Sequence, residues 1–158
     1  MFVKSVVSAL IIAVASSKVI YDVASPDSQF KFCGTANDAL DLKKVEMNPY
    51  PPVPGQNVRV TATGTLKRVI QDGAKEAQVN VLGKKGIFKI DRIVKTCTAE
   101  SELKCPIPAT LPGEPDLVQS YDYLVPAIPS FIKDIELTVS AVNGDESPVT
   151  CFKGPVFF

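Results

Sequence analysis

Residues 131–152 read FIKDIELTVSAVNGDESPVTCF, and this stretch decides the fold class. Two apolar-rich segments, 131–142 and 149–152, flank Asn143-Gly144-Asp145, which is typical of the turn in a β-hairpin. The stretch therefore predicts two antiparallel strands joined by a short turn.

Alternation of apolar and polar residues continues outward from this hairpin. Val58, Val60 and Ala62 alternate with polar neighbours, which is the period of a half-buried strand. The other strand candidates are 40–46, 66–70, 77–82, 86–94 and a short segment at 121–124. About seven strands at spacings of roughly 10 to 15 residues predict an all-β, antiparallel sandwich, because parallel sheets need helical crossovers that this sequence lacks.

The composition narrows the function classes. The 158 residues include 17 basic and 17 acidic residues, 46% hydrophobic residues and no histidine, which fits one globular domain. A net charge of zero without a basic stripe argues against nucleic-acid binding. Without histidine there is no Ser-His-Asp or Cys-His relay, so we expect neither an enzyme nor a metal or cofactor site. The remaining enzymatic alternative is a hydrolase using a Ser-Lys pair or a carboxylate pair, such as Asp38 with Asp41 or Glu114 with Asp116.

The first residues resemble a targeting signal. Lys4 precedes an apolar run at 6–15, and small residues follow at positions 13–17. We expect residues 1–17 to be a signal peptide cleaved after Ala15 or Ser17, residues 18–29 to be an N-terminal extension, and residues 30–158 to be the domain. A retained anchor is the alternative, but the run is shorter than the roughly 20 residues that span a bilayer.

A secretory route favours disulfides among the four cysteines. Cys33, Cys97, Cys105 and Cys151 allow three pairings. The most natural set joins Cys97 to Cys105 around a short loop and joins Cys33 to Cys151 across the domain.

The proline-rich segment 105–130 predicts a long irregular connection, and such connections are often functional. Apolar residues on both parities at 86–94 and 121–132 indicate either a filled core or a cavity between the sheets. The turn 83–86 contains Lys84 and Lys85, which are either solvated or in contact with an anionic membrane surface.

Five short segments, taken in order, carry a family resemblance. They are Phe-Lys-Phe-Cys-Gly at 30–34, Asn-Pro at 48–49, Pro-Gly-Gln at 54–56, the two cysteines at 97 and 105 with Pro-Ile at 106–107, and Val-Thr-Cys-Phe at 149–152. This pattern resembles the ML lipid-recognition domain, with its Niemann-Pick type C sterol carriers and fungal phosphatidylglycerol/phosphatidylinositol transfer proteins. Many relatives have a third disulfide in the proline turn, which here is 51–54 and contains no cysteine. The absence of this disulfide resembles the fungal branch.

The resemblance implies an immunoglobulin-like sandwich that holds a lipid between its sheets, and it supports both disulfides. It also implies that two features shape the pocket mouth. One is an aromatic residue on the strand before the Cys97–Cys105 loop, here Phe88, and the other is the segment after Cys-Pro-Ile. The turn 83–86 and the segment 105–130 are the candidate rim. The predicted ligand-binding residues are Phe88, Ile90, Tyr123, Val125, Ile128 and Phe131.

These implications predict a protein that binds a sterol or a phospholipid and transfers it between membranes. The alternative is a secreted adaptor that presents a bound lipid to a protein receptor. We expect a monomer in the secretory pathway, either secreted or in the vacuolar or lysosomal lumen. Its expected partners are the lipid, a transient membrane surface and a membrane lipid transporter.

Overall fold

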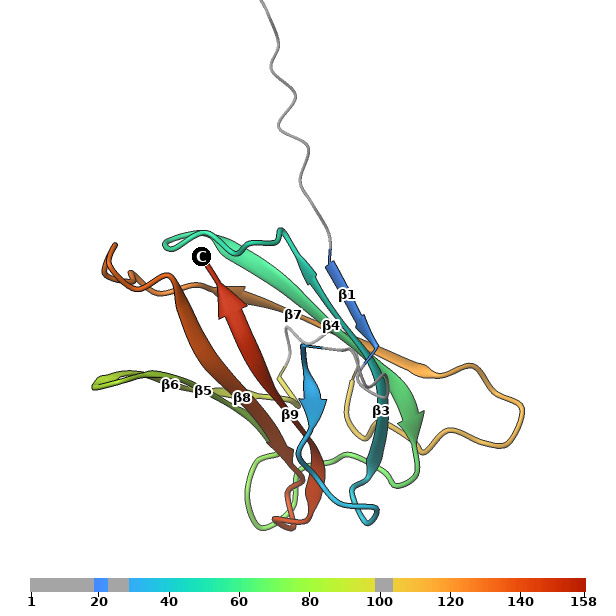
Figure 1. Cartoon of the computed structure of the whole chain (residues 1–158). Helices are drawn as coiled ribbons and strands as arrows, with labels where there is room; N and C mark the ends of the chain where they lie inside the picture. Colours follow the sequence, from blue (N-terminus) through green and yellow to red (C-terminus); the bar gives the residue numbers. More distant parts are fainter. Residues whose placement is uncertain (1–18, 23–28, 99–103) are drawn as a thin grey trace, which may run out of the picture.

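The computed structural model describes residues 19–22, 29–98 and 104–158, and within these ranges it contains nine strands and no helix (Figure 1). No segment of this described part forms a helix able to cross a bilayer. The predicted signal peptide lies outside the described residues. The strands are β1 (Val19–Asp22), β2 (Lys31–Phe32), β3 (Leu40–Asn48), β4 (Asn57–Leu66), β5 (Gln78–Lys85), β6 (Phe88–Lys95), β7 (Leu117–Leu124), β8 (Asp134–Val142) and β9 (Pro148–Phe157).

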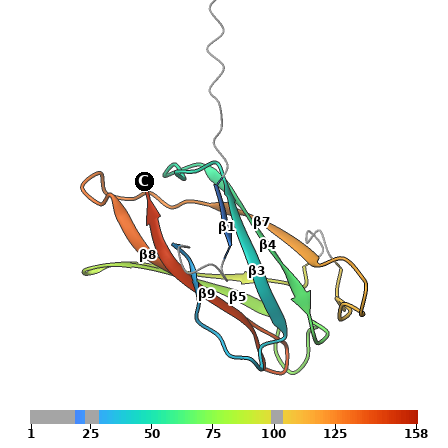
Figure 2. The ribbon, with the colours of Figure 1, turned by 45° about the vertical axis from the view of Figure 1, so that its right-hand side comes forward.

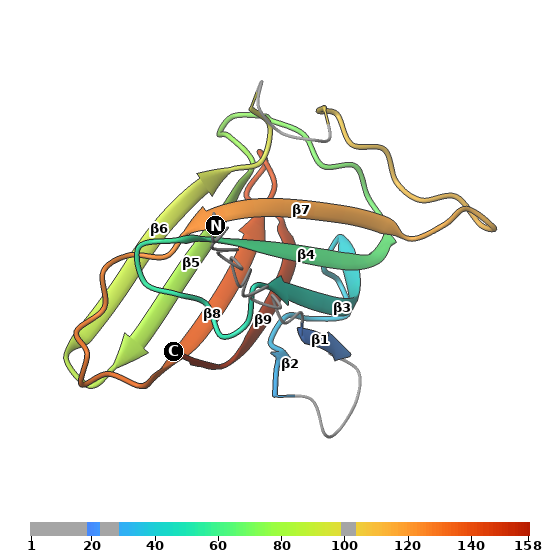
Figure 3. The ribbon, with the colours of Figure 1, turned by 90° about the horizontal axis from the view of Figure 1, so that it is seen from above.

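The strands form two antiparallel sheets. The four-stranded sheet has the order β1-β3-β4-β7, and the five-stranded sheet has the order β2-β9-β8-β5-β6. Seen from above, β4 and β7 run across β5, β6 and β8 at a steep angle (Figure 3). The predicted all-β antiparallel sandwich is confirmed.

The hairpin that decided the fold class is also confirmed. β8 ends at Val142 and β9 begins at Pro148. Asn143 holds the turn in place, because its Nδ2 donates to the Val69 carbonyl at 3.0 Å and its Oδ1 accepts from the Gln71 amide at 2.8 Å. A Cβ on Gly144 would collide with the backbone of the neighbouring loop, so the turn requires glycine there.

Several strand boundaries differ from the prediction; β9, predicted at 149–152, extends from Pro148 to Phe157. The segment 66–70 is not a strand, because β4 already ends at Leu66 and Ile70 forms only an isolated bridge with Ile107. β8 begins at Asp134 rather than at residue 131. The segment 121–124 is the end of an eight-residue strand, β7, which pairs with β4 over its whole length. Pairing to a neighbour therefore extended a strand whose own periodicity is weak.

Two short strands were missed. β1 pairs with β3, from Val19 opposite Met47 to Asp22 opposite Lys44, so part of the expected extension at 18–29 lies in the sheet. β2 pairs with β9 over two residues. Both strands are too short to show a clear period of two, so no local pattern predicts them.

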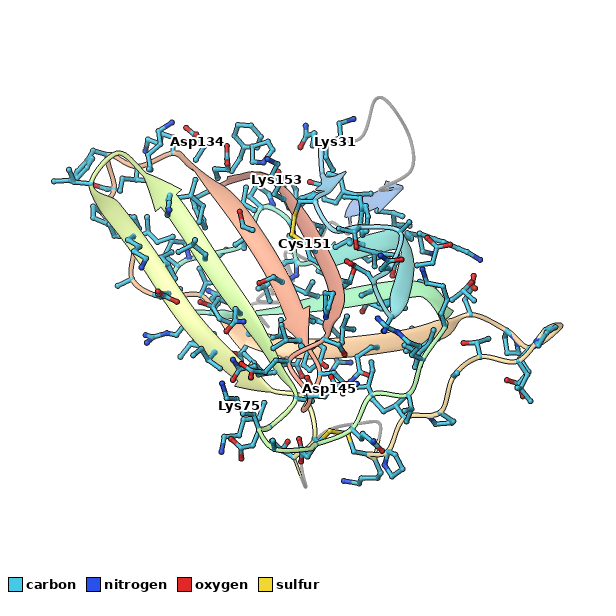
Figure 4. The ribbon with its side chains drawn as sticks, turned by 90° about the horizontal axis from the view of Figure 1, so that it is seen from below. Lys31, Lys75, Asp134, Asp145, Cys151 and Lys153 are labelled. Carbon is cyan, nitrogen blue, oxygen red and sulfur yellow. A yellow bond between two sulfur atoms is a disulfide. The ribbon has the colours of Figure 1, made fainter. Side chains whose placement is uncertain are left out.

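Both predicted disulfides form. Cys33 and Cys151 are 118 residues apart and join the segment after β2 to β9, where Figure 4 shows the sulfur bond beside the labelled Cys151. Cys97 and Cys105 close a loop with a separation of 8 residues. In the chain-entropy model the longer crosslink stabilises the fold by about 4 to 5 kcal/mol.

Candidate functional site

A cavity lies between the two sheets and is lined almost entirely by apolar side chains. It offers about 160 Å³ of space for the centres of water-sized molecules. One water molecule needs only roughly 10 to 15 Å³ of such space, so the cavity is large enough for a much larger guest.

Small side chains leave this space open. The walls are formed largely by inward-facing valines and alanines from the two sheets, among them Val60, Ala62, Val79, Val81, Val139 and Ala141. Because inward and outward residues alternate along each strand, these small residues face one another across the sandwich. The rings of Tyr121, Tyr123, Phe152 and Phe158 also border the cavity but leave this space open.

Three of the six predicted ligand-binding residues line the cavity. Ile90 of β6 and Val125 after β7 are buried, with 8% and 4% exposure, and Tyr123 of β7 faces the same space. Burial raises the pKa of Tyr123, while the nearby Arg92 guanidinium acts in the opposite direction. Their contact with a ligand stays a prediction.

The other three predicted residues lie elsewhere. Phe88 and Ile128 are partly buried and pack against the hydrophobic core without lining the cavity. Phe131 is 82% exposed at the loop end and does not line the cavity, so its expected place at the pocket mouth stays a prediction. It lies in the irregular loop 125–133, where a pattern of alternating side-chain directions does not apply.

The sequence analysis missed a polar group of residues in the cavity wall. Gln119 and Tyr121 of β7 line the cavity together with Thr150 of β9 and Thr96 after β6. Burial raises the pKa of Tyr121, while a hydrogen bond with Thr96 acts in the opposite direction. Gln119 and Thr150 are each only 7% exposed. The one sequence pattern that could have predicted Gln119 is its spacing of two and four residues from Tyr121 and Tyr123, which puts all three side chains on one face of a strand.

Several loops meet at one end of the sandwich, which we call the loop end: residues 49–56, 86–87 and 125–133 with the C-terminal Phe158 (Figures 1 and 2). The Gly55 amide donates to the Val125 carbonyl, and the Val125 amide donates to the Gln56 carbonyl, both at 2.9 Å. Pro52, Val125, Pro126 and Phe158 also line the cavity, so the cavity extends to this end.

The loop end combines exposed apolar side chains with basic ones. Ile87, at the tip of the β5–β6 hairpin, is fully exposed, as Phe131 largely is. Lys85 forms an ion pair with Asp134 at 2.6 Å, which joins the hairpin to the start of β8. Lys84 and Lys133 are exposed beside them.

The expected rim is divided between the two ends of the molecule. Residues 125–130 belong to the loop end, whereas residues 105–116 lie beyond the other end of β7. There the Thr110 amide donates to the Leu66 carbonyl at 2.7 Å, next to the end of β4. The two parts are separated by β7, of which only residues 121–124 were predicted.

The carboxylates considered for catalysis lie outside this cavity. Asp116 accepts hydrogen bonds from Lys43 Nζ at 2.8 Å and from Thr65 Oγ1 at 2.9 Å. These bonds lower the pKa of the Asp116 carboxyl below its ordinary value. Its partner in the suggested pair, Glu114, accepts from the Leu111 amide at 2.8 Å.

The profile of the ML domain matches residues 27–158. A protein named phosphatidylglycerol/phosphatidylinositol transfer protein from Aspergillus oryzae is 32% identical over 142 residues, which cover 82% of this chain and 75% of the relative. A protein of the same name from Neurospora crassa is 29% identical over 140 residues, covering 83% and 73%.

Among solved structures, a Niemann-Pick type C2 protein from the Japanese carpenter ant superposes with a TM-score of 0.59. The match covers 80% of this chain and 96% of the ant protein at 14% sequence identity, so it is a likeness of fold. The two-sheet architecture, the order of the short sequence segments and the extent of the profile match lead to one conclusion. The chain belongs to the ML domain family.

Proposed function

We propose that the protein binds a sterol or a phospholipid in the cavity and transfers it between membranes without chemical change. The observation that carries this proposal is the apolar cavity between the sheets, which reaches the loop end. Burying about 400 Å² of lipid surface at roughly 25 cal/mol per Å² contributes on the order of 10 kcal/mol before the costs of association. Micromolar or tighter binding is attainable on this basis.

The relatives favour a phospholipid as the cargo, because those that match most of this chain are named for phosphatidylglycerol and phosphatidylinositol transfer. A charged phosphate is costly in an apolar space without a counter-charge. In the described part of the chain no lysine or arginine lines the cavity. The headgroup therefore stays at the loop end, near the exposed Lys84 and Lys133.

The loop end is the surface that contacts the membrane in this proposal. Ile87 and Phe131 can enter the headgroup region, and the adjacent lysines are attracted to anionic lipids at about 1 kcal/mol per charge. This arrangement brings the open end of the cavity to the bilayer. The two disulfides and the predicted signal peptide support a secreted or lumenal location.

A transfer assay tests the proposal. Donor vesicles contain fluorescent phosphatidylinositol, phosphatidylglycerol or a fluorescent sterol, and lipid arrival in acceptor vesicles is followed with and without the purified mature protein. We expect saturable binding and accelerated transfer of at least one lipid. If the protein neither binds nor transfers any of the three lipids, the proposal is overturned. Binding without transfer would favour the adaptor function.

A further inference from the structure

Among the buried polar side chains that line the cavity, Gln119 and Thr150 face it from opposite sheets. Gln119 is on β7 and Thr150 is on β9, and both line the cavity. The Nε2 atom of Gln119 and the Oγ1 atom of Thr150 are buried and have no hydrogen-bond partner among the described residues. A buried polar group without a partner destabilises the folded state, and such groups are rare in native proteins.

Both residues lie in the half of the cavity away from the loop end. Gln119 is five residues before Leu124, the last residue of β7, which places it about 17 Å along the strand at roughly 3.3 Å per residue. Thr150 is near the first residue of β9, opposite Ala141, while Phe157 ends that strand beside Asp134. A lipid headgroup held at the loop end is therefore too far away to reach either side chain.

The chemistry of the two groups defines their partner. The Nε2 atom of Gln119 is a donor, and the Thr150 hydroxyl can donate or accept. A carboxylate or phosphate at this depth would need a cation, and the described lining contains none. Asp122 also borders the cavity, but its carboxylate is paired with Arg59 at 2.8 Å. The matching partner is an uncharged oxygen that accepts a hydrogen bond.

We propose that the cargo carries an uncharged oxygen, a hydroxyl or a carbonyl, on its buried end, and that Gln119 and Thr150 bind this oxygen. The inference rests on the proposed lipid-binding function and specifies which lipids the cavity selects. The oxygen can belong to a hydroxylated acyl chain or to the side chain of a sterol. The two residues then act as specificity determinants rather than as parts of the core.

Two matched ligand pairs test this inference in competition with a fluorescent lipid. One pair is phosphatidylglycerol with an oleoyl chain and with a ricinoleoyl chain, which adds one hydroxyl. The other pair is cholesterol and 25-hydroxycholesterol. We expect the wild-type protein to bind the hydroxylated member of at least one pair about fivefold to tenfold more tightly, as one or two net hydrogen bonds imply. The pair that shows this preference identifies the source of the oxygen.

Variants assign the preference to the two side chains. Gln119→Met and Thr150→Val preserve approximate size and shape, and each should lower the preference for the hydroxylated lipid, measured as the ratio of the two affinities, by about threefold or more. Ser120→Ala is the matched control, because Ser120 is adjacent on β7 and its hydroxyl bonds to Thr61 at 2.8 Å. It should leave the preference unchanged.

The melting temperature of the lipid-free protein gives an independent measurement. Since the amide of Gln119 has no partner in the described protein, Gln119→Met should raise it by a few degrees. Equal or weaker binding of the hydroxylated lipids by the wild-type protein, or an unchanged preference in both variants, would overturn the inference. If the wild-type protein binds none of the four lipids, the proposed function itself is overturned.

Discussion

In one part of the sandwich, the filled half, aromatic rings pack on one another, whereas the other part, the open half, contains the cavity; Phe152 borders both parts. In the filled half, Tyr21 of β1 packs on Phe30 with ring centroids 4.7 Å apart, and Phe30 packs on Phe152 of β9 at 5.7 Å. In the open half, residues such as Ala62 and Val139 face the cavity. The same two sheets therefore contain a close-packed region and an open one.

The comparison teaches that side-chain volume, rather than strand topology, determines where the cavity forms. Close packing of large rings contributes dispersion and hydrophobic stabilisation. The side chains that line an empty apolar cavity lack both contributions on the side that faces the cavity. The filled half thus stabilises the fold, which allows the open half to be kept for a ligand. Each of the following changes tests one side of this division of roles.

The largest effect is expected in the filled half. Phe30 has no exposed surface, and Phe30→Ala should lower the free energy of unfolding by about 3 to 5 kcal/mol through the cavity it creates. Urea denaturation measures this loss. Phe157→Ala is the control, because Phe157 is 44% exposed, and it should change the stability by well under half as much. A loss below 1 kcal/mol in Phe30→Ala would show that the rings do not stabilise the fold.

Filling the open half should affect binding instead of stability. Ala62→Phe projects a ring into the cavity, and we expect lipid affinity to fall by at least about 30-fold while the free energy of unfolding changes by less than about 1 kcal/mol. Ala39→Phe is the contrast, because Ala39 is completely buried in the core and the larger ring should destabilise the protein. Unchanged affinity in Ala62→Phe would mean that lipid does not occupy this space.

The loop end should influence transfer without influencing the cavity. We expect Ile87→Ser combined with Phe131→Ser to slow intermembrane transfer by about tenfold, because both apolar side chains lose their burial in the bilayer surface. Equilibrium binding of a soluble short-chain lipid should stay within about twofold of wild type. Val118→Ser, which changes an exposed residue on β7, is the control, and an equal slowing in that variant would contradict the assignment of the membrane contact.

The smallest effect concerns pH and returns to the filled half. Burial and a hydrogen bond with Tyr50 raise the pKa of Tyr21. The stability that this neutral phenol contributes is fully present below its unfolded pKa of about 10 and is lost as the pH rises toward the folded value. Tyr21→Phe should be less stable than wild type at pH 8 by about 1 kcal/mol, and the difference should shrink toward pH 10.5.

Urea midpoints at the two pH values measure this change. The pKa values of Tyr121 and Tyr123 are also raised, but those residues are present in both proteins and cancel in the comparison. A difference that grows with pH would contradict the raised pKa of Tyr21.

Much of the fold was predictable from local patterns. The alternation at Val58 to Ala62, the turn at Asn143-Gly144 and the four cysteines predicted the antiparallel sheets, the hairpin and both disulfides correctly. These features depend on neighbours along the chain or on one covalent pairing. The boundaries of β7 and the existence of β1 depend on pairing with distant strands, which a single sequence does not display.

The site was predictable only in part for the same reason. Ile90, Tyr123 and Val125 lie on or beside regular strands and line the cavity, whereas Phe88, at the start of β6, does not. Phe131 is largely exposed in an irregular loop, where no strand alternation determines its direction. Gln119 was missed because a single glutamine in a strand is most often exposed, and only the sandwich shows that it faces inward.

Native mass spectrometry of the protein purified from its own host tests the central claim most directly, because it shows whether lipid occupies the open half. We predict a bound species heavier than the mature chain by the mass of one lipid, and we predict that Ala62→Phe purified in the same way lacks it. A wild-type protein that carries no lipid and acquires none after incubation with phospholipid or sterol vesicles would contradict the account.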